Sequence, residues 1–200
     1  MHIEKIIFDN IFYTILNVKG RTKDTVKAHL DLEDIRIRKK LHLIWQRDRL
    51  VKLLACYVLN WRKRNQFLAY LRSTRFFDGY ASNLKWCIKS KDGKIVEMKS
   101  HDCHVLLQYV LPVGLRGLLP DNLCDALFNL KTYFSDLYAK MLRRSQIDIL
   151  EKKIIITLCK LEMIFPPSFF DIMVHLLVHL SHEARLDRLV HTRWMYPIER

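Results

Sequence analysis

The sequence predicts a mainly α protein, a helical bundle with one small β-hairpin near residues 84–98. Apolar side chains recur at helical spacing through most of the 200-residue chain, and 50% of the residues are hydrophobic. The dipeptide Asp92-Gly93 lies between two short apolar runs, which is the pattern of a hairpin turn. Serines and prolines in the second half stand where helices would begin and end.

Three helices are predicted in the first half of the chain. The first covers residues 2–17, because isoleucine recurs at every fourth position there, and it is expected to end at Lys19-Gly20. Thr22 or Asp24 is expected to cap a short second helix that ends near Ile35. Residues 41–59 are crowded with leucine and aromatic side chains, which predicts a third helix with basic residues on its opposite face.

The hairpin is predicted to pair residues 84–89 with 95–98, because an Asp-Gly dipeptide tolerates the positive φ of a tight turn. Helices follow at about 101–111, 121–144, 146–165 and 169–186. Pro120 lies where a first-turn proline is tolerated, and Ser145 and Ser168 are the predicted N-caps of the last two helices. Pro166-Pro167 separates these two helices, because proline cannot continue a helix.

Positive charge is concentrated in the first half of the chain. The net charge of +13 predicts a polyanionic partner, nucleic acid before an anionic membrane surface. Residues 1–100 hold 22 Lys and Arg against 10 Asp and Glu, whereas residues 101–200 hold 12 against 11. Between Arg36 and Arg75 stand twelve basic residues and a single acidic one, Asp48.

We name these twelve residues the basic stretch and expect them to bind DNA by neutralising its phosphates. They are Arg36, Arg38, Lys39, Lys40, Arg47, Arg49, Lys52, Arg62, Lys63, Arg64, Arg72 and Arg75. Aromatic residues are interleaved with them and could stack on bases, although rings at helical spacing are usually core residues: Trp45, Tyr57, Trp61, Phe67 and Tyr70. The alternative is that the basic stretch is only a solvated helix face.

Cysteine usage and hydropathy predict an intracellular protein. The five cysteines stand far apart and form no C-x-x-C pair, so neither a disulfide framework nor a zinc ribbon is indicated. The start of the chain lacks the pattern of a secretory signal, and no N-x-S/T sequon occurs. The apolar runs are too short to span a membrane, so no membrane partner is expected.

No metal, cofactor or complete catalytic constellation is predicted. His175, His179 and His182 share one face of a predicted helix and could bind zinc, with His101, Cys103 and His104 as further candidate ligands. Paired ligands at finger spacing and a H-E-x-x-H motif are both absent, so we prefer histidines that pair with carboxylates or backbone. The sequence also lacks a P-loop and a G-x-S-x-G motif.

Six segments, taken in order, resemble one family. They are MHIEK at 1–5, TKDT at 22–25, LDLED at 30–34, KSHDCHVLLQ at 99–108, IFPP at 164–167 and RWMYPIER at 193–200. Together they resemble the plant CACTA (En/Spm) transposon proteins, where the end of the transposase core joins a domain of unknown function. The resemblance implies a basic helical segment at 1–75, including the tail of that core, and a helical domain of unknown function at 76–200.

The core of the family resembles a ribonuclease-H-type transposase that uses an acidic triad and divalent metal ions. Only its tail would be present here, and the chain looks truncated at both ends. Glu4 is the one acid in the matched core motif, which makes it the sole candidate for a remnant metal ligand. The family shows Lys-Asn-Val where this chain has Lys5-Ile6-Ile7, and prolines where it has Leu53-Leu54, which would extend a helix.

The sequence therefore predicts a nuclear or otherwise intracellular, non-catalytic fragment of a CACTA-type transposase. It would contact DNA or help assemble the parent protein with other transposase subunits. The alternative is a helical protein–protein interaction module without DNA binding. Two-metal chemistry requires several converging carboxylates, so a metal-dependent enzyme is the least favoured interpretation.

Overall fold

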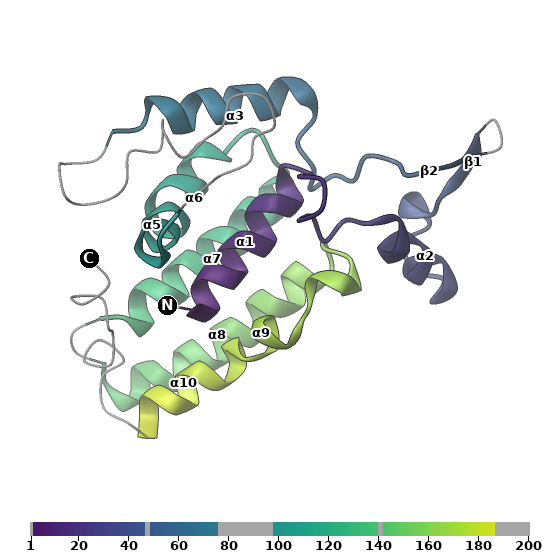
Figure 1. Ribbon diagram of the computed structural model, residues 1–200. Coiled ribbons are helices and arrows are strands. Elements are labelled where there is room, and N and C mark those ends of the chain that lie inside the picture. Colours follow the sequence, from purple (N-terminus) through teal and green to yellow (C-terminus); the bar gives the residue numbers. More distant parts are fainter. Residues whose placement is uncertain (1, 47–48, 76–97, 140–141, 187–200) are drawn as a thin grey trace.

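The computed structural model describes residues 2–46, 49–75, 98–139 and 142–186, and it is mainly α-helical, as predicted. Helix α1 (His2–Ile15) runs through the middle of the molecule (Figure 1). Its buried side chains include Phe8 and Phe12, whose rings stack with their centroids 5.3 Å apart. The helix predicted at 2–17 is confirmed, and most of its residues are buried, so it belongs to the core.

The second half packs around α1 as a helical bundle. Helix α8 (Arg144–Glu162) packs against α7 (Asp121–Leu137) on one side and against α10 (Leu177–Leu186) on another. The short α9 (Ile172–His175) leads into α10 and contacts α1. The Tyr133 hydroxyl of α7 donates to the main-chain oxygen of Leu177 at 2.9 Å. A 3₁₀ helix, η3 (Pro167–Phe169), begins at Pro167, so the prolines separate the last helices as predicted.

The predicted N-caps Ser145 and Ser168 are wrong. Helix α8 begins at Arg144, two residues before the predicted start at 146, which places Ser145 inside the first turn. Asp171 caps α9, because its carboxylate accepts from two main-chain amides of the first turn. The Ser168 hydroxyl instead donates to the main-chain oxygen of Lys23 at 2.7 Å, which holds a distant loop against η3.

Helices α5 (Ser100–Val105) and α6 (Leu111–Gly114) are joined by a π turn, η2 (Leu106–Val110), and together extend the helix predicted at 101–111. The regular α pattern is interrupted just before Pro112, which has no N–H to donate. Helix α3 (Trp61–Ser73) packs against α6 on the outside of the molecule (Figure 1). A Cβ on Gly114 would lie 2.4 Å from Tyr70 Cε1, so only glycine allows this close approach.

We name the projection at one end of the molecule the arm (Figure 1). It consists of α2 (Val26–Asp34), the 3₁₀ helix η1 (Lys39–Leu41), and strands β1 (Ile44–Gln46) and β2 (Arg49–Val51), which pair antiparallel. Thr25 caps α2, in place of the predicted Thr22 or Asp24. The helix ends at Asp34, and the positive φ of Arg36, +59°, brings the Ile37 amide back to the Leu32 oxygen at 3.1 Å.

The helix predicted at 41–59 is wrong. Residues 44–46 and 49–51 form the β1–β2 pair, and residues 52–60 contain no helix. Leu53 and Leu54 are exposed and do not extend a helix. Tertiary contacts decide this conformation, because the Leu59 amide donates to the Ile15 oxygen at 2.9 Å and Tyr57 is buried against the bundle.

The hairpin predicted near 84–98 lies outside the described residues, apart from Met98. The predicted domain boundary at residue 76 also falls there and stays a prediction. The described parts of the chain before and after this boundary share one apolar core. Phe12 and Phe67 precede the boundary, Leu107 and Phe134 follow it, and all four belong to that core. In the described part of the chain, no helix combines the length and the apolar character needed to cross a bilayer.

Candidate nucleic-acid interface

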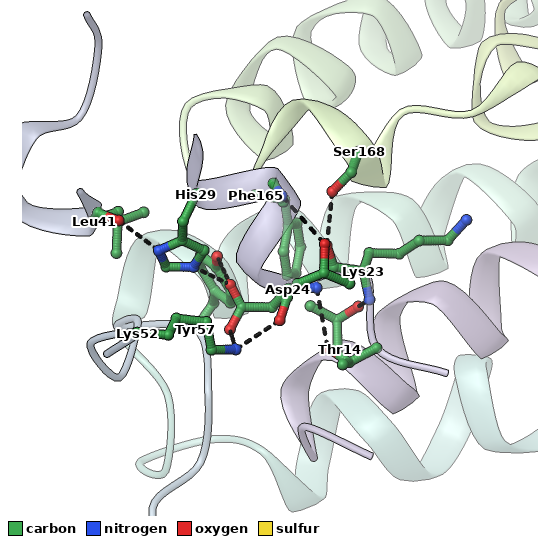
Figure 2. Close-up of polar contacts among 12 residues, drawn as sticks. Thr14, Lys23, Asp24, His29, Leu41, Lys52, Tyr57, Phe165 and Ser168 are labelled. Carbon is green, nitrogen blue, oxygen red and sulfur yellow. Dashed lines mark hydrogen bonds and ion pairs between the residues drawn. The ribbon is translucent and has the colours of Figure 1, made fainter. Parts of the chain in front are cut away.

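The arm is fastened to the bundle through one buried carboxylate, that of Asp24 (Figure 2). His29 Nε2 lies 2.6 Å from Asp24 Oδ1, and the Tyr57 hydroxyl donates to the same oxygen at 2.7 Å. Lys52 Nζ donates to the other carboxylate oxygen at 2.5 Å. His29 Nδ1 faces the Leu41 oxygen at 2.5 Å, so residues from α2, η1 and the segment after β2 meet at Asp24.

This anchor favours the charged form of the Asp24 carboxyl group. Burial would raise the pKa of Asp24, but hydrogen bonds from His29, Lys52 and Tyr57 outweigh it and hold the pKa below its usual value. Both ring nitrogens of His29 face an oxygen, Nδ1 that of the Leu41 carbonyl and Nε2 that of the Asp24 carboxylate. Lys52 therefore forms an ion pair within the protein, and its contact with phosphate stays a prediction.

Arg38, a second residue of the basic stretch, also forms hydrogen bonds within the protein. Its guanidinium donates to the main-chain oxygens of Glu162, Ile164 and Phe165, where α8 ends. The last carbonyls of a helix lack intrahelical partners and carry partial negative charge, so an arginine is well suited to bind them. The arm is thereby joined to the carboxyl end of α8.

The remaining residues of the basic stretch differ in their exposure. Lys63 is exposed, yet its ammonium group donates to the Leu118 oxygen at 2.7 Å. Arg64 and Arg72 are half-buried on α3, and Arg47 lies outside the described residues. The others are exposed to solvent, and the structure therefore leaves these side chains accessible to a phosphate: Arg36, Lys39, Lys40, Arg49, Arg62 and Arg75.

The exposed cations do not form a single surface, because the arm and α3 occupy different parts of the molecule (Figure 1). On the arm, the exposed carboxylates of Asp31, Glu33 and Asp34 stand next to Arg36 and lower the local positive charge. From Arg49 to Arg75 the chain has seven basic residues and no acidic one. The strongest described positive field is therefore expected around α3.

The interleaved aromatic residues divide between core and surface. Tyr57 and Phe67 are fully buried, which agrees with the expectation that most such rings are core residues. Tyr70 is half-buried and packs beside Phe67. Trp45 on β1 and Trp61 at the start of α3 are 72% and 75% exposed, so these two rings are available to a partner.

The structure brings Glu4 and His104 together, although they were candidates for different sites. The Glu4 carboxylate is 1% exposed, and His104 Nδ1 lies 2.9 Å from it. Burial, and then the neighbouring Glu4, raise the pKa of Tyr138, which hydrogen-bonds the same carboxylate. Glu4 is thus a buried acceptor that joins α1, α5 and the end of α7, and not an open position for a metal ion.

The candidate metal ligands are not assembled into one site. His175, His179 and His182 are exposed, and the rings of the first two lie 5.3 Å apart. Cys103 is buried, and burial, aided by Asp9, raises the pKa of its thiol to about 12. Within the described ranges, no group of three or more histidine, cysteine, aspartate or glutamate side chains could hold a metal ion.

The polar anchors of the fold were missed at the level of sequence. Asp24 was considered only as a helix cap, and His29 and Tyr57 were given no polar role. A weak signal was present, since Asp24 stands beside a helix start with a histidine five residues later. The partners Lys52 and Tyr57 are 28 and 33 residues away from Asp24, so spacing alone could not reveal the network.

Comparison with known families supports part of the resemblance. A family model described as a domain of unknown function (DUF4218) matches residues 137–200, and this domain is found in plant transposase-like proteins. The match covers α8, η3, α9 and α10 and lies inside the segment predicted to be a domain of unknown function. Comparison with curated proteins and with solved structures finds no match.

Proposed function

We propose that the protein is a non-catalytic, DNA-contacting part of a CACTA-type plant transposase and acts in the nucleus. The six matching segments and the DUF4218 match support the transposase context. The observation that carries DNA contact is the acid-free run from Arg49 to Arg75, in which Arg49, Arg62 and Arg75 are exposed. Exposed cations without nearby carboxylates bind phosphates and release counterions.

The non-catalytic part of the proposal is supported by the position of Glu4. Two-metal DNA cleavage needs carboxylates that face an open space and converge on the ions. The Glu4 carboxylate is buried and already accepts from His104. Its role is to satisfy polar groups between α1 and α5, so we propose no chemical step at this residue.

A salt titration of duplex DNA binding tests the proposal. Each phosphate contact contributes about −0.9 to the slope of log K against log salt. The variant Arg49→Gln/Arg62→Gln/Arg75→Gln should reduce the slope by about 1.8 if the duplex contacts only the α3 region, or about 2.7 if it also reaches β2. These side chains are exposed, so the variant should fold.

A matched control tests whether the position of the removed charges, and not only their number, determines the change in salt slope. The variant Arg144→Gln/Lys152→Gln/Lys153→Gln removes three exposed cations from α8 and changes the net charge equally. It should leave the slope almost unchanged. The proposal is contradicted if the wild-type protein shows no salt-dependent DNA binding. It is also contradicted if the control variant reduces the salt slope as much as the test variant does.

The second candidate is a protein-interaction module, and the arm carries the observation that favours it. Ile35 and Trp45 of the arm are 57% and 72% exposed, and Leu54, which follows β2, is 60% exposed; basic residues stand near all three in the sequence. Such a surface suits a partner that is both apolar and acidic. A complex that tolerates salt and is lost in Trp45→Ala/Leu54→Ala, without any DNA binding, would favour this candidate.

A further inference from the structure

The outward face of α3 carries a row of side chains that can read the edges of DNA bases. Arg62, Gln66, Ala69 and Ser73 are exposed and stand at i, i+4, i+7 and i+11, so they form one stripe along the helix. Asn65 is exposed beside this stripe. Polar groups of this kind are not needed for packing, because the buried residues of α3 lie on the opposite face.

The chemistry of the stripe matches the major groove of duplex DNA. Asparagine and glutamine amides pair with adenine N6 and N7, arginine pairs with guanine O6 and N7, and alanine can contact a thymine methyl group. The long polar side chains, Arg62, Asn65 and Gln66, occupy the amino-terminal half, and the small Ala69 and Ser73 follow. A helix that enters the groove by its amino-terminal end has its base contacts there.

Helix α3 is held firmly enough to present these side chains. Phe67, Leu68 and Leu71 are buried against the bundle, and Gly114 of α6 lets the ring of Tyr70 approach its backbone closely. The Asn60 side chain accepts from the Lys63 amide at 2.9 Å and caps the helix. Recognition side chains on a rigid helix lose little entropy on binding.

Size and charge indicate duplex DNA rather than RNA. The 13 residues of α3 extend for about 20 Å, and the major groove of B-form DNA is wide enough for such a helix. The major groove of A-form RNA is too deep and narrow for side chains to read. Helix α3 contains basic residues and no acidic ones, which complements a phosphate-lined groove.

We infer that α3 is a recognition helix that inserts its Arg62–Ser73 stripe into the major groove and prefers a short site containing adenine and guanine. This inference rests on the proposed function and adds sequence preference to phosphate binding. One good bidentate contact should make an enriched site bind roughly tenfold more tightly than a scrambled duplex.

The experiment first selects sites from duplexes with a random core, using the full wild-type chain. Binding of the enriched duplex is then compared with the same duplex carrying 7-deazaadenine and 7-deazaguanine, which lack the N7 acceptor of the major groove. The variant Asn65→Ala/Gln66→Ala keeps every cation, Arg62 included, so it should retain the salt slope and the sensitivity to 7-deazaguanine while losing the preference for adenine and the sensitivity to 7-deazaadenine. The control Asn122→Ala removes an exposed amide from α7 and should behave as the wild type.

The outcomes distinguish the two levels of the proposal. Loss of all DNA binding by the wild type would overturn the proposed function and this inference with it. Salt-dependent binding that shows no preference, or a preference indifferent to 7-deaza bases or to Asn65→Ala/Gln66→Ala, would overturn the recognition helix alone. Equal or tighter binding of an RNA duplex of the same sequence would also overturn it.

Discussion

Arg38 Nη1 donates to the Phe165 oxygen at 2.5 Å, so a side chain of the arm closes the end of a helix 127 residues away. The same guanidinium reaches the Glu162 and Ile164 oxygens. Its neighbour Lys39 is exposed and has no such contact among those described. Two adjacent basic residues therefore have different roles, which a charge count cannot distinguish.

Replacing Arg38 should destabilise the protein, whereas replacing Lys39 should not. We expect Arg38→Gln to lower the free energy of unfolding by about 1–2 kcal/mol, because hydrogen bonds from a charged donor are lost at a half-exposed site. Lys39→Gln should change it by less than about 0.5 kcal/mol. Urea unfolding of both variants checks this, and equal stabilities would argue against the helix-closing role.

The Asp24 anchor should weaken in acid. Because its folded pKa is lowered, its contribution to stability is present above the ordinary aspartate pKa of about 3.9 and is lost as the pH falls through the lowered value. Asp24→Asn should therefore cost roughly 3 kcal/mol at neutral pH, where it leaves buried donors without a carboxylate. The difference from the wild type should shrink toward about pH 2.

Unfolding curves of both proteins across this pH range provide the measurement. Asp171→Asn is a useful comparison, since its carboxylate is less buried while hydrogen bonds from Asn10 and Lys23 also lower its pKa against the effect of burial. If Asp24→Asn lowers the free energy of unfolding by the same amount down to low pH, the charged Asp24 carboxylate does not stabilise the fold as described.

Gly114→Ala should loosen α3. The added Cβ would lie 2.4 Å from one carbon of the Tyr70 ring and 2.9 Å from Phe67, both of which belong to α3. We expect a loss of about 1–3 kcal/mol from overpacking, unless the rings move. Tyr70→Leu should relieve part of the cost of Gly114→Ala, and a double-mutant cycle that shows no coupling would contradict the close approach.

Glu4→Ala should reduce stability, and neither the variant nor the wild type should cleave DNA. The substitution leaves His104 and Tyr138 without their shared acceptor in the interior, which should cost about 2–4 kcal/mol. Thermal unfolding measures this loss, and DNA incubated with magnesium or manganese should stay intact with either protein. Metal-dependent cleavage that disappears in Glu4→Ala would contradict the assignment.

Several elements could be predicted because their signals are local. The spacing of isoleucines identified α1, Pro166-Pro167 marked the end of α8, and the periodic second half predicted a bundle. The failed helix at 41–59 has a cause that is not local. Residues 41–59 have a leucine-rich composition, yet contacts of Tyr57, Lys52 and Leu59 with distant residues hold them outside a helix.

The sequence predicted that the candidate interface would be basic, but it could not predict which basic side chains would be accessible. Charge counting identified the basic stretch, while only the structure shows that Arg38 and Lys52 have long-range partners within the protein. The row of Arg62, Gln66 and Ala69 could be recognised only once α3 was known to bury its opposite face against α6.

By itself, the sequence determined the helical class, the concentration of charge in the first half and the resemblance to transposon proteins. These properties depend on composition, local periodicity and motif order, all of which are present before folding. Only the tertiary structure decided that Asp24 and Glu4 are internal acceptors and which cations and amides of α3 face solvent. The free energy of a buried charge or an exposed side chain depends on neighbours that folding brings from far along the chain.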